Sequence, residues 1–334
     1  MKIAIVGATG MLGHHTARAV VAAGHTLTVV HRQSSDLSRL ADLEYCSAIG
    51  DLNDSVSLRR ALQPVDAVIN CAGYYPTLPR PWQEDVTRAL QQMTNFYDAC
   101  KDTDLQKIVY LGGAIALPTH PHGEPGNETL NYSEAPANKN PYLQVKWAMD
   151  NQAKMMANEG LPVVIGIPSM TFGEFDYGPT TGRLIMDIAN GSLPAYVAGN
   201  RNVIYAGDAG RGLLLAAEKG RSGERYLLTG VDIAMDDLIA AIADITQTKA
   251  PKAIPLWLAK IISKAQIARY HYLKGPEPRL SETAIAVLSA GQFLDGSKAE
   301  RELGFTATVT LEEAIRRTLR WFKQTGYVRG QQQI

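Results

Sequence analysis

The sequence predicts an α/β fold built on a doubly wound parallel sheet. Six near-continuous apolar stretches of strand length alternate with helical patterns in the first half of the 334-residue chain. A glycine-rich segment at residues 7–13 joins the first stretch to the first helical pattern. Because crossovers between parallel strands are right-handed and cover both faces of a sheet, this alternation favours a layered α/β architecture.

The expected strands are rich in Ile, Val and Ala and carry few charges. They span residues 2–8, 26–32, 44–50, 66–73, 107–113 and 162–168. Helical spacing of apolar residues predicts helices over 13–24 and 82–100. After residue 169 proline and glycine become frequent and helical segments dominate, although residues 202–230 recover some strand character. The second part therefore forms a smaller lobe packed on the sheet.

The last expected helix, from about 311 to 325, has clear end signals. Thr310 and Glu313 form a capping-box pattern at its start, and Gly326 follows its end. These signals predict an ordered helix close to the C-terminus.

The composition excludes several functional classes. The chain has 33 basic and 33 acidic residues, which argues against a nucleic-acid binder or a polybasic membrane binder. It has no apolar run of about 18 residues, so we expect no membrane span, and the N-terminus does not resemble a signal peptide. Cys46, Cys71 and Cys100 lie in apolar stretches and are interpreted as reduced core residues of a cytoplasmic protein. His120 and His122 lie in a proline-rich loop and predict no metal site.

The glycine-rich turn predicts a dinucleotide site. Gly7 permits the tight turn, Gly10 lets the backbone approach a pyrophosphate, and Gly13 allows close packing of the helix on the strand. The helix start attracts phosphate through its free N–H groups and its dipole. The other expected cofactor contacts of this turn are Thr9, Met11 and Leu12.

The end of the second strand favours NADP(H), with NAD(H) as the alternative. NAD sites usually place an acidic residue here, on the ribose 2′-hydroxyl. This sequence has His31 and Arg32 instead, and no acid before Asp36. Arg32 is expected to pair with a 2′-phosphate, with Ser34 and Ser35 as hydroxyl partners. The alternative for Arg32 is an exposed surface arginine.

Two further segments are expected beside the cofactor. Asp51 and Leu52 follow the third strand, where an adenine edge could be held. Cys71, Ala72 and Gly73 close the fourth strand with small side chains, which leaves room for a flat ring. Both segments follow the carboxyl ends of strands, where ligands bind in sheets of this kind.

Tyr142 and Lys146 are the candidate catalytic residues. They lie four residues apart and share one face of an expected helix, for which Asn140 is a cap and Pro141 a first residue. A free tyrosine has a pKa near ~10, and a nearby ammonium together with an oxidised nicotinamide would lower it. Lys146 would also hold the nicotinamide ribose. Tyr142 would then exchange a proton with a substrate oxygen while hydride moves at the adjacent carbon.

Motifs that carry a family resemblance extend over the whole chain. In the first half they are GATGMLG (7–13), GDL (50–52), VINCAG (68–73) and YLQVK (142–146). In the second half they lie at 161–173, 180–197, 202–212 and 301–308. With these motifs the sequence resembles the extended short-chain dehydrogenase/reductase (NAD-dependent epimerase/dehydratase) family. The resemblance is to its branch of nucleoside-diphosphate-sugar epimerase-like, dihydroflavonol-reductase-like and hopanoid-associated sugar epimerase-like proteins.

The resemblance implies that two parts of the chain have separate binding functions. Residues 1–168 and about 202–220 would form a Rossmann domain that binds NAD(P), and residues 169–201 and 221–330 a substrate-binding lobe. Pro168 and Ser169 would line the nicotinamide. The residues expected to face the substrate are Tyr74 within the loop 74–82, Gly113, Phe172, Arg183 and Tyr196. Arg183 is equally compatible with a surface helix position. The resemblance also implies a homodimer formed through the helix at 82–100 and the helix after Tyr142.

The sequence departs from this family at one catalytic position. The resemblance implies a serine or threonine just after the fifth strand, but Gly112 and Gly113 stand there, and Leu90 replaces a polar residue of the preceding helix. Three hypotheses therefore stay open. They are an epimerase-like enzyme acting on a nucleotide sugar, a carbonyl reductase of dihydroflavonol-reductase type, and an NADP(H)-binding sensor without catalysis. The first is favoured and calls for a cationic clamp on a diphosphate, with Arg183, Arg201 and Arg279 as candidates.

Overall fold

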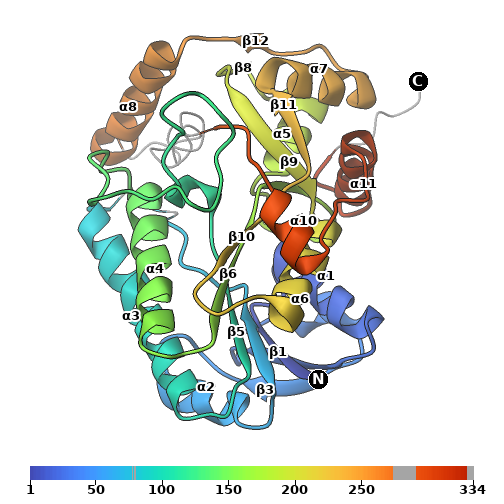
Figure 1. Ribbon diagram of the computed structural model, residues 1–334. Coiled ribbons are helices and arrows are strands. Elements are labelled where there is room, and N and C mark those ends of the chain that lie inside the picture. The colour runs from blue at the N-terminus through green and yellow to red at the C-terminus, as the bar shows by residue number, and fades with distance from the viewer. Residues whose placement is uncertain (77, 79, 274–290, 329–334) are drawn as a thin grey trace.

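The main sheet confirms the predicted α/β doubly wound fold. The computed structural model describes residues 1–76, 78, 80–273 and 291–328. Within this part of the chain, seven parallel strands are ordered β10-β6-β5-β4-β1-β2-β3 (Figure 1). They are β1 (Lys2–Val6), β2 (Thr26–His31), β3 (Cys46–Ile49), β4 (Ala67–Asn70), β5 (Lys107–Leu111), β6 (Val163–Pro168) and β10 (Arg225–Leu228).

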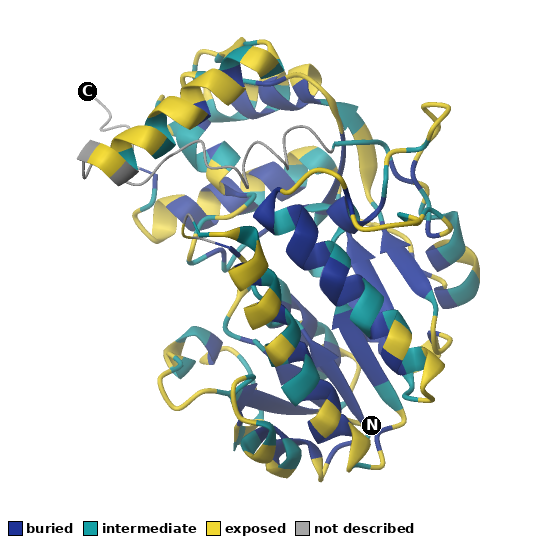
Figure 2. Ribbon diagram, turned by 90° about the vertical axis from the view of Figure 1, so that its left-hand side faces the viewer, coloured by how far each residue is buried: buried dark blue, intermediate teal, exposed yellow. Residues whose placement is uncertain are grey.

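Helices cover both faces of this sheet, and two apolar cores lie between the layers. One face carries α1 (Met11–Ala22) and α6 (Ala206–Lys219). The other face carries α2 (Ser55–Leu62), α3 (Trp82–Lys101) and α4 (Pro141–Asn158). Figure 2 shows most strands of the main sheet as buried between the helices, whereas residues of the edge strand β3 (Cys46–Ile49) are mostly exposed. This double coverage explains why the strands read as continuous apolar runs in the sequence.

The second lobe has its own small sheets and core. Among the described residues, β7 (Met170–Phe172), β9 (Asn200–Tyr205) and β11 (Val231–Ala234) form a sheet ordered β11-β9-β7, and β8 (Ala195–Tyr196) pairs with β12 (Lys252–Ala253). The helices that the structure describes in this lobe are α5 (Arg183–Ala189), α7 (Met235–Thr246), α8 (Leu256–Leu273) and α11 (Leu311–Gln324). Side chains of α5, α7 and α11 share an apolar core with this sheet.

The chain crosses between the two lobes several times. After β7 and β9 in the lobe it returns through α6 and β10 to the main sheet, enters the lobe again at β11, and returns once more as α10 (Ser297–Leu303). Helix α10 packs against α6 and β10. Strand β10 thus belongs to the main sheet, although its residues fall in the range that the sequence assigned to the lobe.

Some local expectations need correction. Cys46 is exposed, because β3 is the edge strand of the sheet; Cys71 is half-buried and Cys100 buried, so the expectation of three core cysteines is wrong at Cys46. At α11 the Thr310 hydroxyl accepts from the backbone N–H of Glu313, but the Glu313 carboxylate pairs with Arg317. Only the threonine half of the predicted capping box is therefore formed.

Candidate active site

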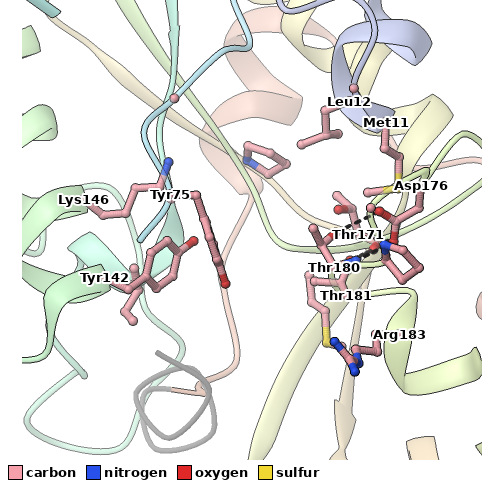
Figure 3. Close-up of a pocket in the computed structure, with 18 of the residues that line it drawn as sticks. Met11, Leu12, Tyr75, Tyr142, Lys146, Thr171, Asp176, Thr180, Thr181 and Arg183 are labelled. Carbon is pink, nitrogen blue, oxygen red and sulfur yellow. Dashed lines mark hydrogen bonds between the residues drawn. The ribbon is translucent and has the colours of Figure 1, made fainter. Parts of the chain in front are cut away.

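A cavity of about 1220 Å³ lies between the sheet and the second lobe. Its wall includes the glycine-rich turn, the residues that follow β4, β5 and β6, the first turns of α4, and the segment 175–184 of the lobe. Figure 3 shows Lys146, Tyr142 and Tyr75 on one side of the space, with Met11, Leu12 and Arg183 on the other. The carboxyl ends of the parallel strands therefore open onto it, as expected for a doubly wound sheet.

The three glycines of the turn are required for different reasons. Gly7 has a φ of +85°, a left-handed backbone conformation that residues with a Cβ atom rarely adopt. A Cβ at Gly13 would lie 2.1 Å from the carbonyl oxygen of Gly7, so glycine is needed for the close approach of α1 to β1. At Gly10 a Cβ would meet nothing closer than 3.6 Å. Gly10 thus leaves free space on the cavity side rather than relieving contact within the protein.

The start of α1 fits a phosphate group. The Gly10 cap supplies no side chain, and no described side chain hydrogen-bonds the first N–H groups of the helix. Thr9, Met11 and Leu12 line the cavity beside it. A helix start with unsatisfied N–H groups and a glycine cradle is suited to a dinucleotide pyrophosphate.

The helix that carries the candidate catalytic pair is fixed at its first turn. The side-chain oxygen of Asn140 accepts from the N–H groups of Tyr142, at 2.9 Å, and Leu143, at 3.3 Å, and Pro141 occupies the first helical position. The predicted cap is confirmed. Because a cap and proline both order the first turn, the backbone of Tyr142 is held rigidly at the edge of the cavity.

Tyr142 and Lys146 lie together on the cavity wall. The Nζ atom of Lys146 lies 6.0 Å from the centre of the Tyr142 ring. Burial lowers the pKa of Lys146 to about 8. Burial, reinforced by the Tyr75 hydroxyl, raises the pKa of Tyr142 above its ordinary value. Burial therefore outweighs any stabilisation of the phenolate by the ammonium, and Tyr142 keeps its proton at neutral pH.

The two glycines after β5 differ in what surrounds them. A Cβ at Gly112 would lie 2.9 Å from Ile167 and 3.1 Å from Ile165, so this glycine is required by packing between strands. Gly113 lines the cavity, and a Cβ there would meet only the Lys146 alkyl chain, at 3.4 Å or more. The residue that lacks a side chain beside the candidate catalytic pair is therefore Gly113, as the sequence suggested.

The loop after β4 presents Tyr75 rather than Tyr74. The Tyr74 hydroxyl donates to the carboxylate of Asp85 at 2.6 Å, and Tyr74 is not part of the cavity wall. Tyr75 lines the cavity, with its ring centre 4.8 Å from that of Tyr142. The prediction for Tyr74 is therefore wrong by one residue, because neighbouring side chains in an extended loop point in opposite directions.

Other predicted substrate residues divide into two groups. Phe172 is fully buried in the core of the second lobe, and Tyr196 packs against that core without lining the cavity. Both predictions fail because Phe172 in β7 and Tyr196 in β8 direct their side chains toward the core of the lobe and not toward the cavity. Arg183 does line the cavity, and its guanidinium lies 3.5 Å from the Asp187 carboxylate.

The lobe contributes polar residues that the sequence did not single out. Asp176 accepts from the N–H of Thr180 at 2.9 Å and from its hydroxyl, which orders the segment opposite Tyr142 (Figure 3). Arg201, considered before only as a clamp candidate, is buried in the wall. A Cβ at Gly291 would lie 1.5 Å from its guanidinium, so Gly291 provides the space that Arg201 occupies. No signal in the sequence marks Gly291, because its partner lies 90 residues away.

Some of the remaining predicted cofactor residues line the cavity, and others lie outside its wall. Pro168, Ser169, Cys71 and Gly73 line it, and the buried Ser169 hydroxyl has no hydrogen-bond partner among the described residues. A bound carboxamide or ribose would satisfy such a group. The residues outside the wall are His31, Arg32, Asp51, Leu52 and Ala72.

These outer residues have contacts of their own. Arg32 is exposed and makes no ion pair within the described chain, whereas His31 contacts the Ser47 hydroxyl at 2.7 Å. The Asp51 carboxylate accepts from the N–H of Asn53, and the Leu52 carbonyl accepts from Asn95. Their assignment to the adenosine end of a cofactor stays a prediction. Arg279 lies outside the described residues.

Comparisons with known proteins agree with this geometry. The family model of the NAD-dependent epimerase/dehydratase family matches residues 3–229. A solved structure of a nucleoside-diphosphate-sugar epimerase from Pseudomonas aeruginosa is 45% identical, with a TM-score of 0.86 over 98% of this chain and 99% of that one.

Curated relatives carry names of other activities. Sterol demethylase protein B of Methylococcus capsulatus is 30% identical over 98% of this chain and 100% of its own length. A putative dihydroflavonol 4-reductase of Synechocystis is 28% identical over 98% of this chain and 96% of its own length. The chain belongs to the NAD-dependent epimerase/dehydratase family and is an enzyme of the extended short-chain dehydrogenase/reductase type.

Proposed function

We propose that this enzyme transfers hydride between NADP(H) and a carbinol or carbonyl carbon of a nucleotide sugar. The observation that carries the reaction type is the position of the half-buried Tyr142 beside Lys146 in the same cavity as the uncapped glycine-rich start of α1. The bound nicotinamide supplies or takes the hydride at the substrate carbon. The protein's own residues must then bind the substrate and manage the proton at its oxygen.

Tyr142 is the residue that handles this proton. Burial raises the pKa of its hydroxyl, so the group is protonated at neutral pH and is the proton source for a carbonyl oxygen that accepts hydride at its carbon. In the opposite direction the oxygen must first have lost its proton, and the tyrosinate then accepts the proton of an alcohol. Lys146 is buried and its pKa is lowered to about 8, but this value is still above neutral pH, so the side chain remains mostly an ammonium close to the tyrosine. Its charge stabilises the tyrosine oxygen whenever that oxygen has lost its proton.

The missing hydroxyl at Gly113 changes how the substrate oxygen is oriented. Loss of a comparable hydrogen-bond donor costs ~10²–10³ in rate in other enzymes. Tyr142 alone therefore orients the oxygen in this protein, or the substrate supplies a donor of its own.

The nucleotide-sugar assignment rests on cations in the wall. Arg201 is buried and Arg183 half-covered by its pairing with Asp187, and both line the cavity on the lobe side. Guanidinium groups suit a diphosphate, which accepts two parallel hydrogen bonds. The relative at 45% identity is named as a nucleoside-diphosphate-sugar epimerase. An epimerase would oxidise and reduce the same carbon without net consumption of cofactor.

A second candidate is reduction of a larger apolar carbonyl compound. Apolar side chains also line the cavity on both of its sides, namely Pro76, Leu78, Ile115, Leu184, Leu193, Met235 and Ile267. The curated relatives named as a sterol demethylase protein and a dihydroflavonol reductase point the same way.

The experiment compares two substrate panels with the purified protein and NADP(H). UDP- and TDP-sugars are followed by NMR for inversion at a ring carbon, and apolar ketones are followed by oxidation of NADPH. Inversion of a nucleotide sugar supports the proposal. Reduction of apolar ketones alone selects the second candidate, and tight NADPH binding without turnover on either panel selects the sensor hypothesis.

Tyr142→Phe tests the chemical role directly. We expect turnover to fall by ~10²–10⁴, the range for loss of a positioned acid, while NADPH binding persists. Tyr132→Phe is the matched control, because Tyr132 packs in the same small apolar cluster as Tyr142 but does not line the cavity. Equal turnover of wild type and Tyr142→Phe would remove Tyr142 from the mechanism.

A further inference from the structure

Helix α8 carries an exposed apolar stripe that the proposed reaction does not use. Trp257, Ile261 and Tyr272 are 63%, 56% and 85% exposed. At about 100° per residue these three side chains fall within an arc of roughly 60° of the helix surface. Figure 2 faces this side of the molecule and shows exposed residues on successive turns of the helix. Large apolar side chains gathered this way mark an interaction surface.

Cations flank this stripe on both sides. Lys260 and Lys264 lie along one edge and Arg269 along the other, and none of the three makes an ion pair with a described residue. We call these cations and the stripe together the α8 outer face. The opposite side of the helix is covered, since Ala259 and Ser263 are buried.

The surrounding sequence concentrates positive charge although the whole chain is neutral. Residues 245–273 contain no Asp or Glu, and their cations are Lys249, Lys252, Lys260, Lys264 and Arg269. Both lysines outside α8 are exposed as well. This segment therefore presents one sign of charge to its surroundings.

We propose that the α8 outer face binds the surface of an anionic lipid bilayer. On the exposed side of α8, aromatic and branched apolar side chains have cations on both flanks, an arrangement that suits the interface of an anionic membrane. The apolar side chains enter the headgroup region, while the lysine and arginine stems extend along them and keep their charges at the phosphates. A protein partner fits less well, because lysine is depleted in protein–protein interfaces.

This contact would be peripheral, and it would place the bilayer next to the candidate active site. No helix in the described part of the chain meets the length and hydropathy needed to cross a membrane. Ile267, on the covered side of α8, lines the cavity between the lobes. One helix thus contributes both to the bilayer-binding surface and to the cavity wall. The inference stands independently of which substrate occupies that cavity.

Flotation of the full chain with lipid vesicles tests the proposal. Vesicles of phosphatidylcholine are compared with vesicles in which part of it is replaced by phosphatidylglycerol. We expect the wild-type protein to float with the anionic vesicles, to float much less with the zwitterionic ones, and to be released by salt.

Two variants separate the charged and apolar contributions. Lys260→Glu with Lys264→Glu should weaken binding by about 25-fold or more, since each cation near an anionic surface contributes roughly fivefold. Trp257→Ser with Ile261→Ser should weaken it more than about tenfold through lost apolar burial. The matched control is Val56→Ser with Arg60→Glu on α2, which also changes one exposed apolar residue and one exposed cation.

The outcomes decide the proposal. Loss of flotation in both α8 variants, with the control unchanged and all thermal unfolding curves alike, supports it. Absence of wild-type flotation, or equal flotation of the α8 variants, overturns it. If Trp257→Ser with Ile261→Ser converts a dimer to a monomer in gel filtration and the wild type does not float, the face binds a second copy of the chain and the proposal is wrong.

Discussion

Gly113 lacks the side chain that its position beside Tyr142 and Lys146 would use. The structure leaves room for one, because a Cβ would contact only the Lys146 alkyl chain at 3.4 Å. Its backbone is extended, with a φ of −145°, so glycine is not needed for conformational reasons. The absence of a side chain at Gly113 therefore affects the chemistry of the site and not the backbone or the packing. Its neighbour Gly112, in contrast, is required by packing against two isoleucines of β6.

This difference predicts opposite results for two adjacent substitutions. Gly113→Ser should fold with wild-type stability and raise turnover, because the hydroxyl supplies a donor to the substrate oxygen. Gly112→Ser should lower the free energy of unfolding by about 1–3 kcal/mol, since its side chain would press on Ile165 and Ile167. Urea unfolding of both variants checks the pair. Equal destabilisation would show that Gly113 is also structural.

Arg32 offers a test of cofactor choice at a single exposed residue. Arg32→Ser should weaken NADPH binding by about 10-fold or more, the worth of a charged hydrogen bond, and leave NADH binding unchanged. Fluorescence titration measures both affinities, with Arg60→Ser on α2 as a control for loss of an exposed cation. Equal loss for both cofactors would disprove a contact with the 2′-phosphate.

The lowered pKa of Lys146 predicts a pH-dependent stability. Burial favours the neutral amine in the folded protein, where the pKa is about 8, while the unfolded chain keeps its proton up to about 10.5. Between these values the unfolded state binds more protons, so stability contributed by this site rises with pH across the window. The gain is on the order of 3 kcal/mol at most.

Comparison with Lys146→Met isolates this contribution. The variant cannot titrate at position 146, so the wild-type free energy of unfolding should rise relative to that of the variant between pH 8 and pH 10.5. Denaturant unfolding at the two pH values provides the measurement. Parallel curves for the two proteins would contradict the buried-ammonium interpretation.

At the scale of elements, the sequence predicted the main sheet well. Each of the six expected strands contains an observed one, because strands covered on both faces read as apolar runs, and only the edge strand β3 is largely exposed among these six. The glycine turn and the cap of α4 were equally readable, since both depend on a few neighbouring residues. The side chains that face the substrate part of the cavity could not be identified from the sequence in this way. Whether Tyr75, Phe172 or Tyr196 faces the cavity is decided by short lobe strands and an irregular loop that no periodicity describes.

Strand β10 shows the same limit in the main sheet. Residues 225–228 are all buried, but their place beside β6 depends on a pairing across nearly 60 residues of chain. Sequence spacing carries no information on such a contact.

At the scale of the whole molecule, Asp208 links the two lobes. It lies buried in the first turn of α6, and its carboxylate accepts from the N–H groups of Thr308 and Val309, at 2.8 and 2.9 Å, just before α11 begins. Arg211 pairs with it at 3.0 Å. The start of a helix in the main domain thus holds the segment that leads to a helix in the lobe.

Asp208→Ala should therefore destabilise the entire protein. We expect a loss of about 2–4 kcal/mol in the free energy of unfolding, because the substitution removes a buried, charged acceptor of two backbone N–H groups and a hydroxyl. Asp237→Ala, at an exposed position in the first turn of α7, should change stability by less than about 1 kcal/mol. Calorimetry of the two variants compares them. A small effect at Asp208 would mean that the lobes are held together by apolar contacts alone.

Strand β10 comes much later in the sequence than its neighbour β6, and this order affects folding during synthesis. Strand β6 is complete at Pro168, yet its neighbour in the sheet ends at Leu228, so a growing chain must extend a further 60 residues before that edge is paired. Every residue of β6 is buried in the finished protein. An apolar strand with a free edge is a site for aggregation, and domains emerging from the ribosome fold from the N-terminus. During synthesis this nascent sheet is therefore exposed to mispairing, and it is at this stage that binding by a chaperone would matter most.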